Sequence, residues 1–141
     1  MAVRYELNTE RPFIAIRNDV AGDRYTPSAG EYLVNSLEED LHDVKVSSGG
    51  FYSTDLGVIT TDGHPQNGLI VPARGFLRVG LSTWDEYDEL VVSWRVEFAT
   101  RAPSPESAAF GSYKGLADAS YVDDIPILGG PGWIVPREII Y

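Results

Sequence analysis

The chain has 141 residues, 43% hydrophobic and 11% aromatic, which is enough for one domain with a sizeable core. Its 21 acidic and 11 basic residues give a net charge of −10, and no two basic residues are adjacent, which disfavours nucleic acids and anionic membranes as partners. The absence of cysteine excludes disulfides and thiolate chemistry, and the N-terminal stretch lacks the apolar segment of a secretory signal.

The N-terminal part predicts two short strands followed by a loop. Residues 5–7 and 13–17 are rich in β-formers and are separated by a charged segment around Pro12. Residues 18–27 contain Asp, Gly and Pro at positions typical of turns. We therefore expect residues 18–27 to form a loop before the next element of the fold.

That element is predicted to be a short helix over about residues 29–42. Ser28 and Glu31 have the spacing of a capping box, in which each side chain satisfies a free backbone N–H at the start of a helix. The apolar residues that follow at helical spacing are Leu33, Leu37, Leu41 and Val44. We expect this apolar stripe to pack against a sheet.

Residues 45–71 predict a return to short strands. They are expected near residues 45–47, 51–52, 56–61 and 69–71. The dipeptides Gly49-Gly50, Asp62-Gly63 and Asn67-Gly68 are expected to form the turns between them.

Residues 75–100 carry the clearest pattern in the chain. Leu77 and Val79 alternate with Arg78 and Gly80, and the second run alternates in the same way through Trp94, Val96 and Phe98. A period of two over this length is typical of half-buried antiparallel strands. We expect one long hairpin within an all-β antiparallel sandwich.

The last forty residues change in character. Residues 102–120 are small and polar and predict an extended loop, and apolar clusters separated by Gly and Pro follow. We divide the chain into a core, residues 1–101, and an extended C-terminal arm, residues 102–141, which packs on the core or on neighbouring subunits. The residues of the arm expected at an interface are Trp133, Ile134, Val135, Ile139, Ile140 and Tyr141.

No catalytic constellation stands out. His42 is expected at the end of the helix and His64 in a turn, and neither has the context of a Ser/His/Asp triad. Gly129-Gly130-Pro131-Gly132 does not lead from a strand into a helix, as a phosphate-binding loop does. We expect neither an enzyme nor a cofactor.

The connection between the two alternating runs is acidic and aromatic. Its carboxylates are a candidate Ca²⁺ site without the spacing of a dedicated calcium loop, and they also blunt a hairpin tip against aggregation. These carboxylates are Asp85, Glu86, Asp88 and Glu89. Trp84 and Tyr87 beside them suit a sugar ring, a protein interface or the core, and the sequence does not separate these three.

Residues 73–103 carry the pattern E-L-x-V-x-(aromatic)-x-V-E-(aromatic), from Glu89 to Phe98, followed by Pro103. This region resembles the closing hairpin of the jelly-roll shell domain in coat proteins of small icosahedral, tombusvirus-like RNA viruses. The resemblance implies a jelly-roll-like sandwich and a virion protein. The chain departs from that group in lacking a basic N-terminal arm and in being short.

We therefore expect a non-enzymatic virion structural protein, a capsid decoration, cement or minor capsid component, made in the host cytoplasm. Its partners would be other copies of itself or a major capsid protein, and neither nucleic acid nor membrane. The alternative is a carbohydrate-binding β-sandwich module that uses Trp84 and Tyr87 beside the carboxylates.

Overall fold

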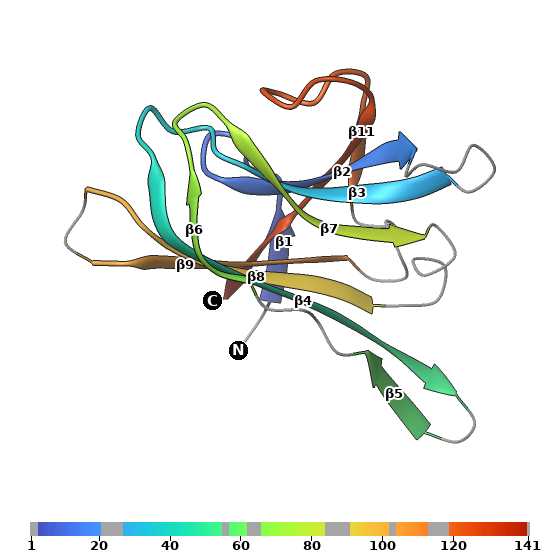
Figure 1. Ribbon diagram of the computed structural model, residues 1–141. Helices are drawn as coiled ribbons and strands as arrows, with labels where there is room; N and C mark the ends of the chain where they lie inside the picture. Colours follow the sequence, from blue (N-terminus) through green and yellow to red (C-terminus); the bar gives the residue numbers. More distant parts are fainter. Residues whose placement is uncertain are drawn as a thin grey trace.

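Two antiparallel sheets pack face to face as a β-sandwich in the computed structural model of the chain (Figure 1). The structure describes residues 3–20, 27–54, 57–61, 66–83, 91–101, 104–112 and 119–140. These residues contain strands, turns and bends and no helix. The all-β prediction is therefore confirmed at the level of a two-sheet sandwich.

The larger sheet has seven strands. Their order is β1 (Val3–Glu6), β12 (Arg137–Ile140), β9 (Glu106–Ser112), β8 (Val91–Ala99), β4 (Leu41–Thr54) and β5 (Gly57–Thr61), with β6 (Gln66–Val71) also paired to β4. The long strand β4 pairs with β6 along its first half and with β5 along its second half. The distal half of β4 and β5 extend away from the smaller sheet (Figure 1).

The smaller sheet has five strands. Their order is β10 (Ser120–Val122), β11 (Gly132–Val135), β2 (Phe13–Val20), β3 (Pro27–Val34) and β7 (Phe76–Thr83). In each sheet the outermost strands pair on one side only, which leaves their other backbone edge without a strand partner among the described residues.

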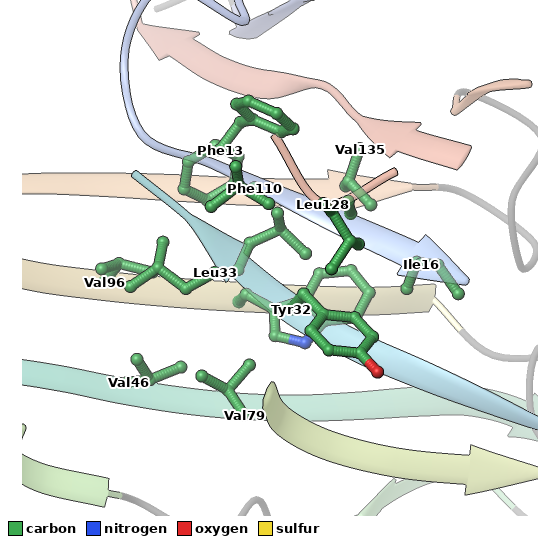
Figure 2. Close-up of a cluster of buried hydrophobic side chains, with 14 of the residues drawn as sticks. Phe13, Ile16, Tyr32, Leu33, Val46, Val79, Val96, Phe110, Leu128 and Val135 are labelled. Carbon is green, nitrogen blue, oxygen red and sulfur yellow. The ribbon is translucent and has the colours of Figure 1, made fainter. Parts of the chain in front are cut away.

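The core lies between the sheets. Figure 2 shows Leu33 and Val79 from the smaller sheet together with Val46, Val96 and Phe110 from the larger one. Trp94, Val96 and Phe98 are buried while Arg95 and Glu97 are exposed, so the alternation of β8 follows the sequence prediction. Burial of such side chains is the main source of stability in a sandwich.

The helix predicted over residues 29–42 is wrong. Residues up to Val34 form β3, residues 35–40 form a bend, and Leu41 begins β4. Glu31 does not cap a helix: its carboxylate lies between the sheets and accepts a hydrogen bond from the Trp94 indole N–H, 3.4 Å away. His42 is consequently an exposed residue of β4 and not the end of a helix.

The predicted hairpin of residues 75–100 is also wrong, although both of its strands exist. β7 pairs with β3 in the smaller sheet, whereas β8 pairs with β4 and β9 in the larger one. The chain therefore crosses between the sheets at this point and does not fold back on itself within one of them.

Two smaller expectations need correction. Asn67-Gly68 lies within β6 and Gly49-Gly50 lies within β4, so neither dipeptide forms a turn, and Asp62-Gly63 lies outside the described residues. Part of the predicted loop over residues 102–120 is β9, which pairs with β8 along seven residues. Small residues such as Ala108 and Ala109 are compatible with this strand because it lies between two others and Ala108 packs against the core.

One end of the sandwich is fixed by Asn35, which is fully buried. Its side-chain N–H groups lie 2.9, 3.2 and 3.0 Å from the carbonyl oxygens of Glu39, Val71 and Pro72. The side-chain oxygen of Asn35 accepts a hydrogen bond from the backbone N–H of Leu37. The backbone N–H of Asn35 donates to the Gly75 carbonyl. This residue therefore joins the β3–β4 bend to the β6–β7 turn.

Residues 13–16 of β2 and residues 29–34 of β3 are buried on both faces, since consecutive residues such as Ile14 and Ala15 are fully buried. The connection between β10 and β11, residues 123–131, lies on the side of these strands that faces away from the larger sheet (Figure 1). Ile125 and Leu128 of this connection are buried in the core cluster. The segment therefore acts as a third, partial layer.

Candidate functional site

The C-terminal residues expected at an interface are placed within the sandwich of the same chain. β11 pairs with β2, and β12 pairs with β1 and β9. Ile134 and Val135 are buried in the core, so their assignment to an intersubunit surface is wrong. Pro136 between the two strands ends the ladder of β11, where the chain passes from one sheet to the other.

Trp133 differs from its two neighbours because it is only partly buried. Its ring meets the ring of Tyr121 edge-on, with the centroids 5.3 Å apart. Tyr121 lies on the outermost strand β10 and is 57% exposed. Ile139 and Ile140 belong to β12, but their side chains and the whole of Tyr141 lie outside the described residues.

The acidic and aromatic connection is also outside the described residues. This applies to Trp84, Asp85, Glu86, Tyr87, Asp88 and Glu89, and also to His64. Within the described part of the chain, no group of three or more His, Asp or Glu side chains is arranged to hold a metal ion. No helix there is long and apolar enough to span a bilayer.

The exposed large hydrophobic side chains form a pattern that the sequence analysis missed. Among the described residues they are Leu7 (47% exposed), Ile70 (60%), Phe76 (44%) and Tyr121 (57%). Leu7 directly follows β1, and the other three lie on β6, β7 and β10. In the described part of the chain each of these strands pairs on one side only, so the exposed apolar surface follows the edges of the two sheets. The sequence could not show this pattern because edge position depends on the pairing.

A second feature is a row of arginine and aromatic side chains on the outer face of the smaller sheet, which we call the Arg–aromatic row: Arg17, Tyr32, Phe76 and Arg78. The Arg17 guanidinium lies 4.9 Å from the centre of the Tyr32 ring and donates to its hydroxyl at 3.0 Å. The Tyr32 and Phe76 rings meet edge-on at 5.9 Å. Tyr32 and Arg78 are directly opposite each other on β3 and β7.

The row faces outward because its neighbours in β3 face inward. Side chains alternate along a strand, and Glu31 points between the sheets toward Trp94. Tyr32 therefore points to the opposite face, together with Arg78 across the ladder and Phe76 two residues before it. Phe76 and Arg78 are the exposed members of the row, whereas Tyr32 is nearly buried.

A third feature is a cluster of charged side chains around Arg137. Arg11 pairs with Glu106, and the Arg137 guanidinium lies 5.5 Å from the centre of the Phe110 ring and donates to the Pro12 carbonyl. Burial, and then the positive charge of Arg11, lowers the pKa of Arg137, while Glu106 raises it. The Nε atom of Arg137 is buried without a hydrogen-bond partner. The arrangement holds β12 in place through the contacts of Arg137 with Pro12 and Phe110.

No match to this sequence was found among protein-family models or among curated proteins. Within the described part of the chain, the buried side chain of Asn35, the Glu31 carboxylate and the Arg137 guanidinium each contact other elements of the fold.

Proposed function

We propose that this protein is a non-enzymatic structural component of a virion, a capsid decoration, cement or minor capsid protein. It works through contacts with other copies of itself, with a capsid lattice, or with both. The surface that makes these contacts is the set of apolar edges of the two sheets, whereas Ile134 and Val135 of β11 are buried within the chain.

The observation that carries the proposal is the position of the exposed apolar side chains. Natural sandwiches normally blunt their edges with charge, proline or bulges, because an open edge invites pairing with another chain. Here Ile70, Phe76 and Tyr121 are each exposed by more than two fifths on strands that pair on one side only. Edges that keep apolar side chains are suited to burial against a neighbour.

A jelly-roll-like connectivity belongs to the same proposal. It is supported by the repeated crossing of the chain between the sheets, as from β6 to β7 and from β11 to β12. Among the described residues, four pairs of consecutive strands pair antiparallel within one sheet: β2 with β3, β4 with β5, β8 with β9, and β10 with β11. Homo-oligomers, a virion location and a major capsid protein as partner are further parts of the proposal.

A carbohydrate-binding module is a second candidate, favoured by the pair of Tyr121 and Trp133. An exposed aromatic ring braced by a second ring can stack on the face of a pyranose, and the exposed carboxylates of Asp123 and Asp124 follow Tyr121 in the chain. Titration of intrinsic fluorescence with a panel of glycans tests this candidate. Quenching that a Tyr121→Ser variant abolishes would favour the module.

The experiment for the structural proposal measures the mass of the protein by size-exclusion chromatography with light scattering over a range of concentrations. We expect the natural sequence to form species larger than the monomer. A triple variant, Ile70→Ser, Phe76→Ser and Tyr121→Ser, is expected to remain monomeric, because it removes apolar area from three edges.

Deleting the C-terminal strands β11 and β12 would be a poor test, because the deletion removes core residues such as Ile134 and would unfold the sandwich. A matched control replaces exposed residues on strands inside the larger sheet, as Lys45→Ser, Arg95→Ser and Glu97→Ser. The control should assemble like the natural sequence. A monomer at every concentration, which also fails to bind particles purified from the source, would overturn the proposal.

A further inference from the structure

We propose that the Arg–aromatic row is the docking surface for a second copy of this chain, which presents its acidic bend at residues 38–40. This inference rests on the proposed function, since it specifies which surfaces meet when the protein assembles. The contact joins two different surfaces, so copies would exchange it across a two-fold axis, close into a ring or extend as a filament.

The receiving surface is fixed before any partner arrives. Arg17 is held over the Tyr32 ring by its hydrogen bond to the tyrosine hydroxyl, and Phe76 braces the same ring from β7. Tyr32 is nearly buried, so it cannot change its position freely. Surfaces built on rigid strands with few mobile side chains lose little entropy on binding.

Charge gives the surface its preference. Arg78 is exposed and makes no hydrogen bond or ion pair with any residue in the described part of the chain. It lies beside the exposed ring of Phe76 in a protein whose net charge is −10. An acidic segment of a second copy fits this combination of an arginine and an aromatic face.

The acidic bend is presented in a way that suits this role. Glu38, Glu39 and Asp40 are consecutive, and the Glu38 side chain is 89% exposed with only a 4.0 Å contact to Arg74. The bend is tied to the rest of the sandwich, since the side-chain carboxylates of Glu39 and Asp40 accept hydrogen bonds from the backbone N–H groups of Arg101 and Ala73. The bend therefore projects a carboxylate from a rigid base at one end of the sandwich.

A competing explanation is that Arg78 only protects an open edge. β7 has a register shift opposite Glu31 and Tyr32, and a charge next to such an irregularity is a common device against strand pairing. The two explanations predict opposite effects of replacing Arg78. Loss of a protecting charge promotes association, whereas loss of a docking residue weakens it.

The test is sedimentation velocity on the full chain at low and at high salt. Arg78→Glu is expected to raise the dissociation constant of self-association about tenfold, and high salt should weaken the natural contact because exposed charges are screened. The matched control is Arg95→Glu, the same charge reversal at an exposed position of β8 in the other sheet, which is expected to behave like the natural sequence.

The partner segment is tested by Glu38→Arg, which should weaken association alone and restore it when combined with Arg78→Glu. Equal effects of Arg78→Glu and Arg95→Glu, no effect of Glu38→Arg, or no recovery in the double variant would each overturn the inference. If the natural chain assembles and the triple variant of Ile70, Phe76 and Tyr121 does not, the proposed function stands even when this inference fails. If the natural chain is monomeric and binds no particle, both fail.

Discussion

Replacing Asn35 by alanine tests whether this residue holds one end of the sandwich together. The substitution removes side-chain hydrogen bonds to the carbonyls of Glu39, Val71 and Pro72 and the bond accepted from the Leu37 N–H. The bond to Val71 is fully buried, so water does not replace the donor that its carbonyl loses. An unsatisfied buried group costs about 1–3 kcal/mol, and each further lost bond about 1 kcal/mol.

We therefore expect Asn35→Ala to lower the free energy of unfolding by about 3 kcal/mol, since the partly exposed carbonyls regain water. For a domain of this size the melting temperature should fall by about 10 °C. Urea denaturation followed by tryptophan fluorescence gives the free energy, provided that the slope of the transition is unchanged.

The matched control is Asn8→Ala. Asn8 accepts a hydrogen bond from the Glu10 N–H at 3.0 Å in an exposed turn, where water replaces the lost partner. Its loss should cost less than about 1 kcal/mol. If Asn35→Ala were no more destabilising than Asn8→Ala, the hydrogen bonds of Asn35 between the β3–β4 bend and the β6–β7 turn would not stabilise the fold as the geometry indicates.

Three further predictions concern the interior. Gly132→Ala should destabilise the fold by several degrees in a thermal melt, because a Cβ there would overlap the carbonyl oxygen of Ile16 and lie 2.7 Å from the end of the Ile125 side chain; an unchanged melting temperature would contradict the close packing of β11 on β2. Ile134→Ala should lower the free energy of unfolding by about 2–5 kcal/mol in urea denaturation, as expected of a core residue. A loss below about 1 kcal/mol would indicate that Ile134 lies at the surface. Trp94→Phe should cost about 1–3 kcal/mol, since it removes the N–H that Glu31 accepts, and a neutral result would contradict that contact.

The sequence predicted the class of fold because alternation survives where one face of a strand is buried. β8 shows this, with Trp94, Val96 and Phe98 inward and Arg95 and Glu97 outward. It also predicted strands near residues 13–17 and 69–71, where β2 and β6 lie. Composition and turn residues were sufficient for these elements because the signal is local.

The helix was mispredicted because β3 is buried on both faces. Tyr32, Leu33 and Val34 are consecutive buried residues, so alternation is lost and the leucine spacing fits a helix equally well. The segment that covers the outer face of β3 comes from residues 123–131, about a hundred positions later in the chain. Local pattern cannot reveal such a contact.

The site was harder to predict than the fold for the same reason. A short polar connection suits a hairpin and a crossing between sheets equally well, so the partners of β7 and β8 could not be derived from spacing. The C-terminal part was predicted to be an extended arm because Gly and Pro interrupt its apolar clusters. In the structure Gly132 packs closely on β2, and Pro136 lies where the chain changes sheets. Edge positions follow only from the complete pairing.

The central claim is that assembly buries the edges of the sandwich while the C-terminal strands already belong to its core. Hydrogen–deuterium exchange at low and high protein concentration tests this most directly, because it reports where backbone amides become protected. We predict concentration-dependent protection in β6 and β7, around Ile70 and Phe76, with no change in β11. Protection that increases in β11 and β12 and not in β6 or β7 would contradict the account.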